Sequence, residues 1–257
     1  MIVISNLYKS FEGKIILNDL NLTVKKGETT VIIGRSGAGK SVLLKTIVGL
    51  IRPDSGSIKI NGKEVTDLSE KEYDKVRMEI GMVFQGGALF DSMTVAENVA
   101  FVLNEFMDLD SRTVNDKVED ALAMVGLKGI EHLNPSHLSG GMKKRVSLAR
   151  VLCMEPQIIL YDEPTSEVDP ITADAINHLI VDLLNKLKVT SIVVTHDMSL
   201  AFQVADSIAM FYHGQVIAQG PPREIRTTTH PVVKQFIYGK SQGPITDNEN
   251  LIFGHVK

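Results

Sequence analysis

Cysteine is nearly absent from this chain of 257 residues, tryptophan is absent, and long apolar runs are missing. The one cysteine, Cys153, excludes an internal disulfide and fits a reducing compartment. It stands in the apolar helical pattern VSLARVLC, so we expect a small buried side chain and not a nucleophile. Apolar runs such as residues 31–33 and 158–160 predict core strands, far short of the roughly 20 residues of a membrane span. The N-terminal MIVISNLYKSF predicts a strand and no signal peptide.

A surplus of basic charge is missing as well. Lys and Arg number 27 against 31 Asp and Glu, a formal net charge of -4, which argues against a nucleic-acid binder. Hydrophobic content of 44% and charged content of 23% are ordinary for a soluble globular protein. The length therefore fits one large domain, or a domain with an inserted lobe.

Short β-branched segments alternate with helical patterns, which predicts an α/β fold with a mostly parallel sheet. The expected strands are residues 1–7, 15–24, 29–33, 158–161, 191–195 and 207–211. Ser69 and Thr94 begin S/T-x-x-E capping boxes, and each predicts a helix start. The expected helices are residues 40–50, a segment after Ser69, residues 94–126 and residues 231–238. Residues 86–155 then form a mostly helical lobe between two strands.

The string GRSGAGKS matches G-x-x-x-x-G-K-[ST], after an expected strand and before an expected helix. Its glycines let backbone N–H groups wrap a phosphate, and the helix adds its positive N-terminal end. Lys40 is expected at the β- and γ-phosphates, and the Ser41 hydroxyl at Mg²⁺. The residues expected around the nucleotide here are Gly34, Arg35, Ser36, Gly37, Ala38, Gly39, Lys40, Ser41 and Val42.

Two acids end the apolar strand IILYDE, at the carboxyl edge where open α/β sheets place ligands. Asp162 is the expected Mg²⁺ partner, and Glu163 is expected to polarise the attacking water. A solvated acid at a strand end is the plainer alternative. His196 follows the strand SIVVT and can bond the γ-phosphate or fix the water. Gln85 follows GMVF, and its amide can contact Mg²⁺ or the water and signal to the lobe. Lys40, Gln85, Glu163 and His196 form the expected catalytic set.

The string LSGGM completes a set that resembles the ATP-binding cassette (ABC) ATPases over about residues 1–222. Ser139, Gly140 and Gly141 open a helix, so N–H groups and a hydroxyl face outward. The resemblance implies that this segment closes over the γ-phosphate held by the other subunit of a homodimer. It also implies that Phe11 stacks on adenine and that Asp169 belongs to the nucleotide site.

The resemblance implies a P-loop NTPase fold with a mostly parallel core sheet, an N-terminal antiparallel β region and the inserted helical lobe. Residues 1–226 are the expected ATPase domain, with the lobe at about residues 86–155. Residues 227–257 are a C-terminal tail. The chain departs from the family at SEVD, where Glu167 replaces a small residue at the expected dimer seam. Val42, Met142 and Arg35 stand where threonine, glutamine and proline are common.

Several segments resemble the Mla/Mce-type lipid-transport ATPases: GKSV, FQGGALFDSMTVAENVAF, SGGMKKR and the tail PVVKQFIYGKSQGPI. This implies an ATP- and Mg²⁺-dependent ATPase that powers lipid transport between membranes. It implies transmembrane permease subunits, an MCE-type lipid-binding protein, a small regulatory subunit in some systems, and a tail that reaches the other ATPase subunit. The expected location is the cytoplasmic face of the inner membrane.

Three alternatives stay open at this point. The first is the ATPase of an importer for amino acids or another small solute, against which the tail and the GALFDS segment argue. The second is a soluble ABC ATPase acting on DNA or ribosomes, disfavoured by the acidic charge and by the lack of a coiled-coil insert or second cassette. The third is a P-loop kinase or a nucleotide-binding module without turnover, which LSGGM and IILYDE disfavour.

Overall fold

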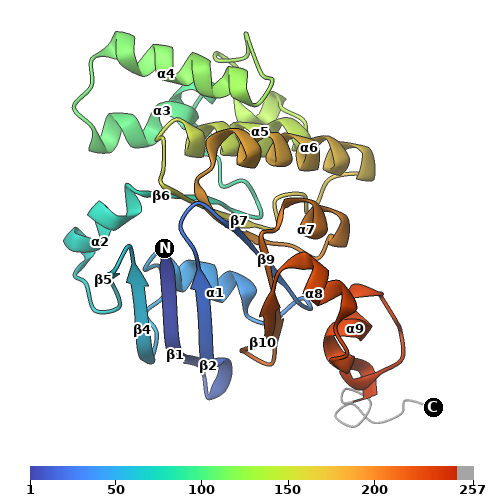
Figure 1. Cartoon of the computed structure of the whole chain (residues 1–257). Coiled ribbons are helices and arrows are strands. Elements are labelled where there is room, and N and C mark those ends of the chain that lie inside the picture. Colours follow the sequence, from blue (N-terminus) through green and yellow to red (C-terminus); the bar gives the residue numbers. More distant parts are fainter. Residues whose placement is uncertain (248–257) are drawn as a thin grey trace.

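The computed structural model describes residues 1–247, which fold into two sheets with a layer of helices (Figure 1). The strands are β1 (Ile2–Phe11), β2 (Lys14–Val24), β3 (Thr29–Ile33), β4 (Ser55–Ile60), β5 (Lys63–Glu64), β6 (Ile80–Val83), β7 (Ile158–Asp162), β8 (Thr190–Val194), β9 (Ser207–Tyr212) and β10 (Gln215–Gly220). The helices are α1 (Lys40–Ile47), α2 (Glu70–Arg77), α3 (Val95–Phe106), α4 (Ser111–Met124), the 3₁₀ turn η1 (Pro135–His137), α5 (Gly140–Leu152), α6 (Pro170–Leu187), α7 (Met198–Val204), α8 (Pro222–Thr227) and α9 (Pro231–Ile237).

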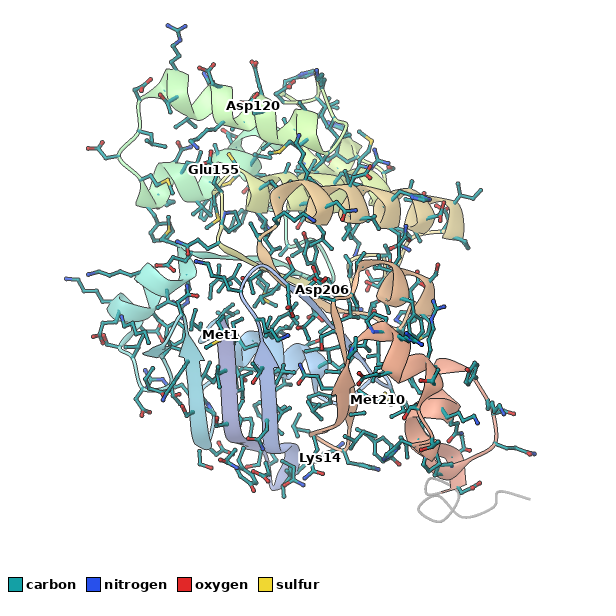
Figure 2. The ribbon with its side chains drawn as sticks, viewed as in Figure 1. Met1, Lys14, Asp120, Glu155, Asp206 and Met210 are labelled. Carbon is teal, nitrogen blue, oxygen red and sulfur yellow. The ribbon has the colours of Figure 1, made fainter. Side chains whose placement is uncertain are left out.

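The larger sheet has the strand order β10-β9-β3-β8-β7-β6. Its pairs are parallel except for β10, which runs antiparallel to β9. Every residue of β3, β6, β7 and β8 is buried, which is why these strands are mostly apolar and show no alternation of apolar and polar residues. Asp206, labelled in Figure 2, accepts a hydrogen bond from the Thr29 N–H at 2.8 Å and fixes β9 beside β3. The predicted mostly parallel core sheet is confirmed.

The smaller sheet is antiparallel, in the order β2-β1-β4-β5. The predicted turn between the first two strands is present, with φ of 50° at Glu12 and 79° at Gly13. The N-terminal antiparallel region is therefore confirmed. Strand β1 runs on to Phe11, beyond the predicted end at residue 7, and the sequence analysis missed β4 and β5.

Side chains alternate between two hydrophobic cores on the two faces of the larger sheet. Val31 and Ile33 face the core that holds α3 to α9, whereas Ile32 faces the core shared with α1 and the small sheet. Helix α1 therefore lies between the two sheets, with Leu43 and Leu44 fully buried. This places the start of α1, and the glycine-rich loop before it, at the carboxyl edge of the larger sheet.

The predicted helical lobe is confirmed as α3, α4 and α5 between β6 and β7 (Figure 1, top). The predicted capping boxes are present at α2 and α3. The expectation of helix throughout residues 94–126 is wrong, because α3 ends at Phe106 and a new helix begins after Asp110. The Asp110 carboxylate accepts bonds from the N–H groups of Arg112 and Thr113, at 3.0 and 3.1 Å, and so caps a separate helix.

The C-terminal part of the described chain packs against its own subunit. Helix α9 forms as predicted, and buried Gln235 accepts a hydrogen bond from the Ile245 N–H at 2.8 Å. Ile245 is itself buried, which holds this part of the tail against its own subunit. The expected contact of this tail with a second copy stays a prediction, as do the domain bounds at residues 226 and 227. Residues 248–257 of the predicted tail lie outside the described part.

The structure also bears on the expectations for Cys153 and for membrane spans. Cys153 is buried, as expected for a small filler at the end of α5. No helix within residues 1–247 has both the length and the apolar character that a membrane span needs.

Candidate functional site

The residues singled out at strand ends meet at one edge of the larger sheet. Strands β3, β8, β7 and β6 are neighbours in that order, and three of their pairings are parallel, so their carboxyl ends lie side by side. The glycine-rich loop follows β3, His196 follows β8, and Glu163 and Gln85 follow β7 and β6. A hollow of about 560 Å³ at this edge is lined by most of the loop together with Gln85, Glu163, Ser166 and His196. This volume suits a small-molecule ligand.

The glycine-rich loop curls around its own lysine. Lys40 Nζ donates hydrogen bonds to the carbonyl oxygens of Gly34 at 2.7 Å and Arg35 at 3.0 Å. Gly39 has φ of 103°, and a Cβ there would lie 2.9 Å from Ile16 Cγ2, so only glycine fits this approach. Lys40 is 6% exposed, and burial lowers its pKa, while Glu163 and then Asp162 oppose that shift by Coulombic attraction. The ammonium group thus lies at the loop's centre, beside the acids.

The paired acids take up different positions. Asp162 is 3% exposed and accepts a hydrogen bond from Ser41 Oγ at 2.7 Å. Burial raises the pKa of its carboxyl, and the bond from Ser41 opposes this shift. The expected magnesium residues Ser41 and Asp162 are therefore in direct contact. Their hydroxyl and carboxylate oxygens are ligands that Mg²⁺ prefers.

The Glu163 carboxylate contacts both the His196 imidazole and the Lys40 ammonium group. Its Oε2 lies 2.7 Å from His196 Nδ1, and its Oε1 lies 3.7 Å from Lys40 Nζ. Its backbone is left-handed, with φ of 47°, and its N–H donates to the Val194 carbonyl oxygen at 3.0 Å. A non-glycine residue adopts this conformation at a cost of about 1–3 kcal/mol, and such strain gathers at functional sites. The His196 side chain is 71% exposed and lines the hollow.

The remaining predicted residues lie elsewhere. Ser139 caps α5, where its Oγ accepts from the Met142 N–H at 3.3 Å, and Gly140 and Gly141 form the first turn. Asp169 caps α6 by accepting from Thr172 N–H at 3.0 Å. None of these is among the residues that line the hollow of the described chain. A single chain therefore does not bring its own LSGGM segment to its phosphate loop.

The aromatic residue expected under adenine stands at the tip of the small sheet. Phe11 ends β1, is 43% exposed, and its ring centroid lies 5.2 Å from Lys9 Nζ. Val42, which stands where threonine is common, is half-buried and packs against the core around α1. These placements leave the roles of the site residues as predictions.

The sequence analysis missed four residues at the site. Ile16 of β2 and Phe236 of α9 line the hollow, and Ser166 and Lys144 connect its loops by hydrogen bonds. Ile16 and Phe236 come from segments far along the chain, and no local string marks them. Ser166 is the first residue of SEVD, a string that the sequence analysis considered only for its departure from the family pattern at Glu167. The position of this serine shortly after the paired acids was the available signal.

The comparison with protein families gives a match to the model described as ABC transporter over residues 17–166, more than half of the chain. The chain is 42% identical to the "probable ribonucleotide transport ATP-binding protein mkl" of Mycobacterium tuberculosis, over 96% of this chain and 69% of that one. It is 40% identical to the intermembrane phospholipid transport system ATP-binding protein MlaF of Haemophilus influenzae, over 95% and 93%. It is also 40% identical to the methionine import ATP-binding protein MetN of Carboxydothermus hydrogenoformans, over 92% and 71%.

Among solved structures, the dimeric ATP-binding cassette MJ0796, described as a post-hydrolysis state bound to ADP and Pi, superposes with a TM-score of 0.78. The two are 32% identical over 87% of this chain and 99% of that one. The P-loop cassette fold expected from the resemblance is thus confirmed, and so is an activity of ATP hydrolysis. The chain belongs to the ABC transporter family, as the ATP-hydrolysing subunit.

Proposed function

We propose that two copies of this chain bind ATP between them and power lipid transport through a membrane permease. Within each copy, Lys40 binds the β- and γ-phosphates, because it is the cation at the centre of the phosphate loop. The backbone N–H groups of the loop and the positive end of α1 add to this anion site. Phe11 stacks on the base from the edge of the small sheet.

The proposed attack on the γ-phosphate uses the pair Glu163 and His196. Glu163 takes a proton from the attacking water, and its contact with His196 at 2.7 Å holds the carboxylate toward the phosphate loop. The second ring nitrogen of His196, which does not contact Glu163, binds the γ-phosphate or the water. Gln85 orients the water from the neighbouring strand end. The observation that supports these roles is their shared lining of one hollow with the loop.

Ser41 and Asp162 would hold Mg²⁺, with Gln85 as a further oxygen donor. The 2.7 Å contact between the Ser41 hydroxyl and the Asp162 carboxylate shows that both oxygens already converge beside the phosphate loop. Bound there, the ion would neutralise charge that develops on the phosphate oxygens.

The second half of the nucleotide contact comes from the partner copy. Residues 139–141 form the N-terminus of α5, where backbone N–H groups point out of the helix. These residues do not line the hollow of their own chain. In a head-to-tail pair they close over the γ-phosphate of the other copy, with Asp169 and the tail near the seam. The dimeric description of MJ0796 supports this arrangement.

An apolar groove of about 440 Å³ between the lobe and the core sheet offers a seat for the permease. Phe84, Phe90, Phe101 and Phe106 line it, with Phe90 41% and Phe106 60% exposed. Arg77 and Asp74 are among its lining residues, so a short helix with an apolar face and polar groups at one end would fit. Phe84 and Ala88, on either side of Gln85 in the chain, both line the groove, so a change at Gln85 on loss of the γ-phosphate would reach the permease. This contact would hold the subunit at the cytoplasmic face of the inner membrane.

The transported class that we propose is phospholipid or a related lipid. The observation that carries this proposal is the 40% identity to MlaF. The match spans 95% of this chain and 93% of MlaF, which is nearly the full length of both. An MCE-type lipid-binding protein, and in some systems a small regulatory subunit, would complete the complex. The name of mkl points to ribonucleotides and that of MetN to methionine. A methionine or other small-solute importer is therefore the second candidate.

The test is reconstitution of the chain with its permease in liposomes, followed by transfer of fluorescent phospholipid to acceptor vesicles. ATP-dependent transfer by the wild type, and none with Glu163→Gln, is the expected result. The Glu163→Gln variant should still bind ATP and form closed dimers, because the amide keeps the side chain's shape. Stimulation of ATP hydrolysis by methionine without lipid transfer would establish the second candidate instead. An unchanged hydrolysis rate in Glu163→Gln would remove that residue from its role.

A further inference from the structure

Helix α5 carries a buried lysine that joins two loops of the nucleotide site. Lys144 is 8% exposed, and its Nζ donates hydrogen bonds to the Gln85 carbonyl oxygen and to Ser166 Oγ, the second at 3.4 Å. Lysines are almost never buried to this degree unless they are paired. The ammonium group therefore serves as a fixed bridge between the segment after β6 and the segment after β7.

Ser166 extends this bridge to the proposed base. Its Oγ donates to the Glu163 carbonyl oxygen at 2.9 Å, and its N–H donates to the same oxygen at 3.1 Å. Because Glu163 holds a left-handed backbone, its orientation depends on such support. The contact of Lys144 with Ser166 therefore influences the direction of the Glu163 carboxylate.

The segment after Gln85 is held by the same helix at further points. Arg150 Nη1 donates to the Ala88 carbonyl oxygen at 2.7 Å, and Nη2 donates to that of Gly87 at 3.0 Å. With the Lys144 contact, the carbonyl oxygens of Gln85, Gly87 and Ala88 all accept bonds from α5. A displacement of this helix is thus passed directly to the segment that carries the Gln85 amide.

The charge of Lys144 has a partner in the unusual SEVD loop. Burial lowers the pKa of Lys144, and Coulombic attraction from Glu167 opposes that shift. Glu167 is the residue that departs from the small residue expected in this loop. The carboxylate of the exposed Glu167 therefore favours the charged form of Lys144.

We propose that Lys144 is a positioning residue that couples the nucleotide site of its own copy to that of the partner. The helix that carries it begins at residues 139–141, the segment proposed to close over the partner's γ-phosphate, so the inference rests on that function. Closure of these residues on the partner's nucleotide moves α5 as a unit. Lys144 then sets Gln85 directly and Glu163 through Ser166, so that hydrolysis in one site depends on occupation of the other.

The test uses the complex with its permease and the variants Lys144→Met, Lys144→Arg and Lys143→Met. Lys143 is the adjacent, half-buried lysine of the same helix, so its variant controls for loss of positive charge. For Lys144→Met we expect kcat to fall about tenfold, in line with loss of hydrogen bonds from a charged donor. The Hill coefficient for ATP should fall to 1, while the Kd for a fluorescent ATP analogue changes less than about twofold. Lys144→Arg should restore most of the rate, and Lys143→Met should match the wild type.

A second comparison separates positioning from folding. Ser166→Ala keeps Lys144 but removes the hydroxyl that passes its contact to Glu163, and it should lower kcat in the same direction. If both act through one chain of contacts, the double variant should be no slower than Lys144→Met alone. Multiplied losses in the double variant, or a Lys144→Met protein with wild-type kcat and Hill coefficient, would overturn the proposal.

The outcomes also distinguish failure of this inference from failure of the proposed function, in which two copies share each nucleotide site. A wild-type complex with a Hill coefficient of 1, and no ATP-dependent dimer of Glu163→Gln, refutes the shared sites and the coupling together. A cooperative wild type with an equally cooperative Lys144→Met variant refutes the coupling by Lys144 alone.

Discussion

Replacement of Asp162 by asparagine should stabilise the isolated subunit while it abolishes turnover. Burial raises the pKa of the Asp162 carboxyl, so the folded state disfavours its charged form, and the bond from Ser41 offsets this only in part. Asparagine has the same shape, lacks the charge, and can still accept the bond from Ser41. It cannot supply the negative oxygen proposed for Mg²⁺.

The expected gain is about 1 kcal/mol of unfolding free energy at pH 7, the usual size for relieving one unfavourable group. For a chain of this size, 1 kcal/mol corresponds to a rise in Tm of about 2–4 °C. A carboxyl whose folded pKa is raised favours the folded state below its unfolded pKa, and this contribution is lost as pH rises through the folded pKa. The advantage of the Asp162→Asn variant over the wild type should therefore shrink as pH falls toward that range.

Thermal unfolding followed by circular dichroism, with ATP hydrolysis measured in parallel, checks both halves of the prediction. Asp110→Asn is the matched control, because hydrogen bonds, first that from the Thr113 hydroxyl, lower the pKa of the Asp110 carboxyl. Its stabilising contribution exists above its unfolded pKa and is lost in acid, so this variant should gain nothing at pH 7. Hydrolysis by Asp162→Asn should fall at least about 100-fold. A Tm at or below that of the wild type would refute the reasoning from burial.

Two further outcomes follow from packing. Gly49→Ala should destabilise the fold by about 3 kcal/mol, because a Cβ there would lie 2.5 Å from the Tyr73 ring at φ of 70°; an unchanged urea midpoint would contradict this. Burial raises the pKa of the Cys153 thiol to about 11, so a thiol reagent at pH 8 should label the native protein far more slowly than the urea-unfolded one. Equal labelling rates in the two states would show that α5 opens readily.

The convergence of Lys40, Glu163 and His196 could be predicted because each of them belongs to a short, recognisable string of neighbouring residues. Each string stands at the end of an apolar strand, and parallel neighbours bring those ends to one edge, so Lys40, Glu163 and His196 had to converge once the sheet formed. The break between α3 and α4 was missed because apolar residues recur at helical spacing on both sides of it. Asp110, with its short side chain before the second helix, was the cap that the pattern concealed.

Lys144 could not have been predicted from the sequence. In the string MKKRV a lysine reads as part of a solvated helix face, and only the arrival of the loops after β6 and β7 encloses it. Phe236 is similar, because its place at the hollow depends on how the tail returns to the core. Burial of a single side chain by segments distant in sequence has no local signal.

The residues proposed to bind the nucleotide come from both sheets. The aromatic ring expected to meet the base belongs to a hairpin of the antiparallel sheet, whereas the acids, the histidine and the phosphate loop grow from the parallel one. Replacing the aromatic ring in this hairpin should therefore change how tightly the base is held, while the residues at the carboxyl ends of the parallel strands stay in place.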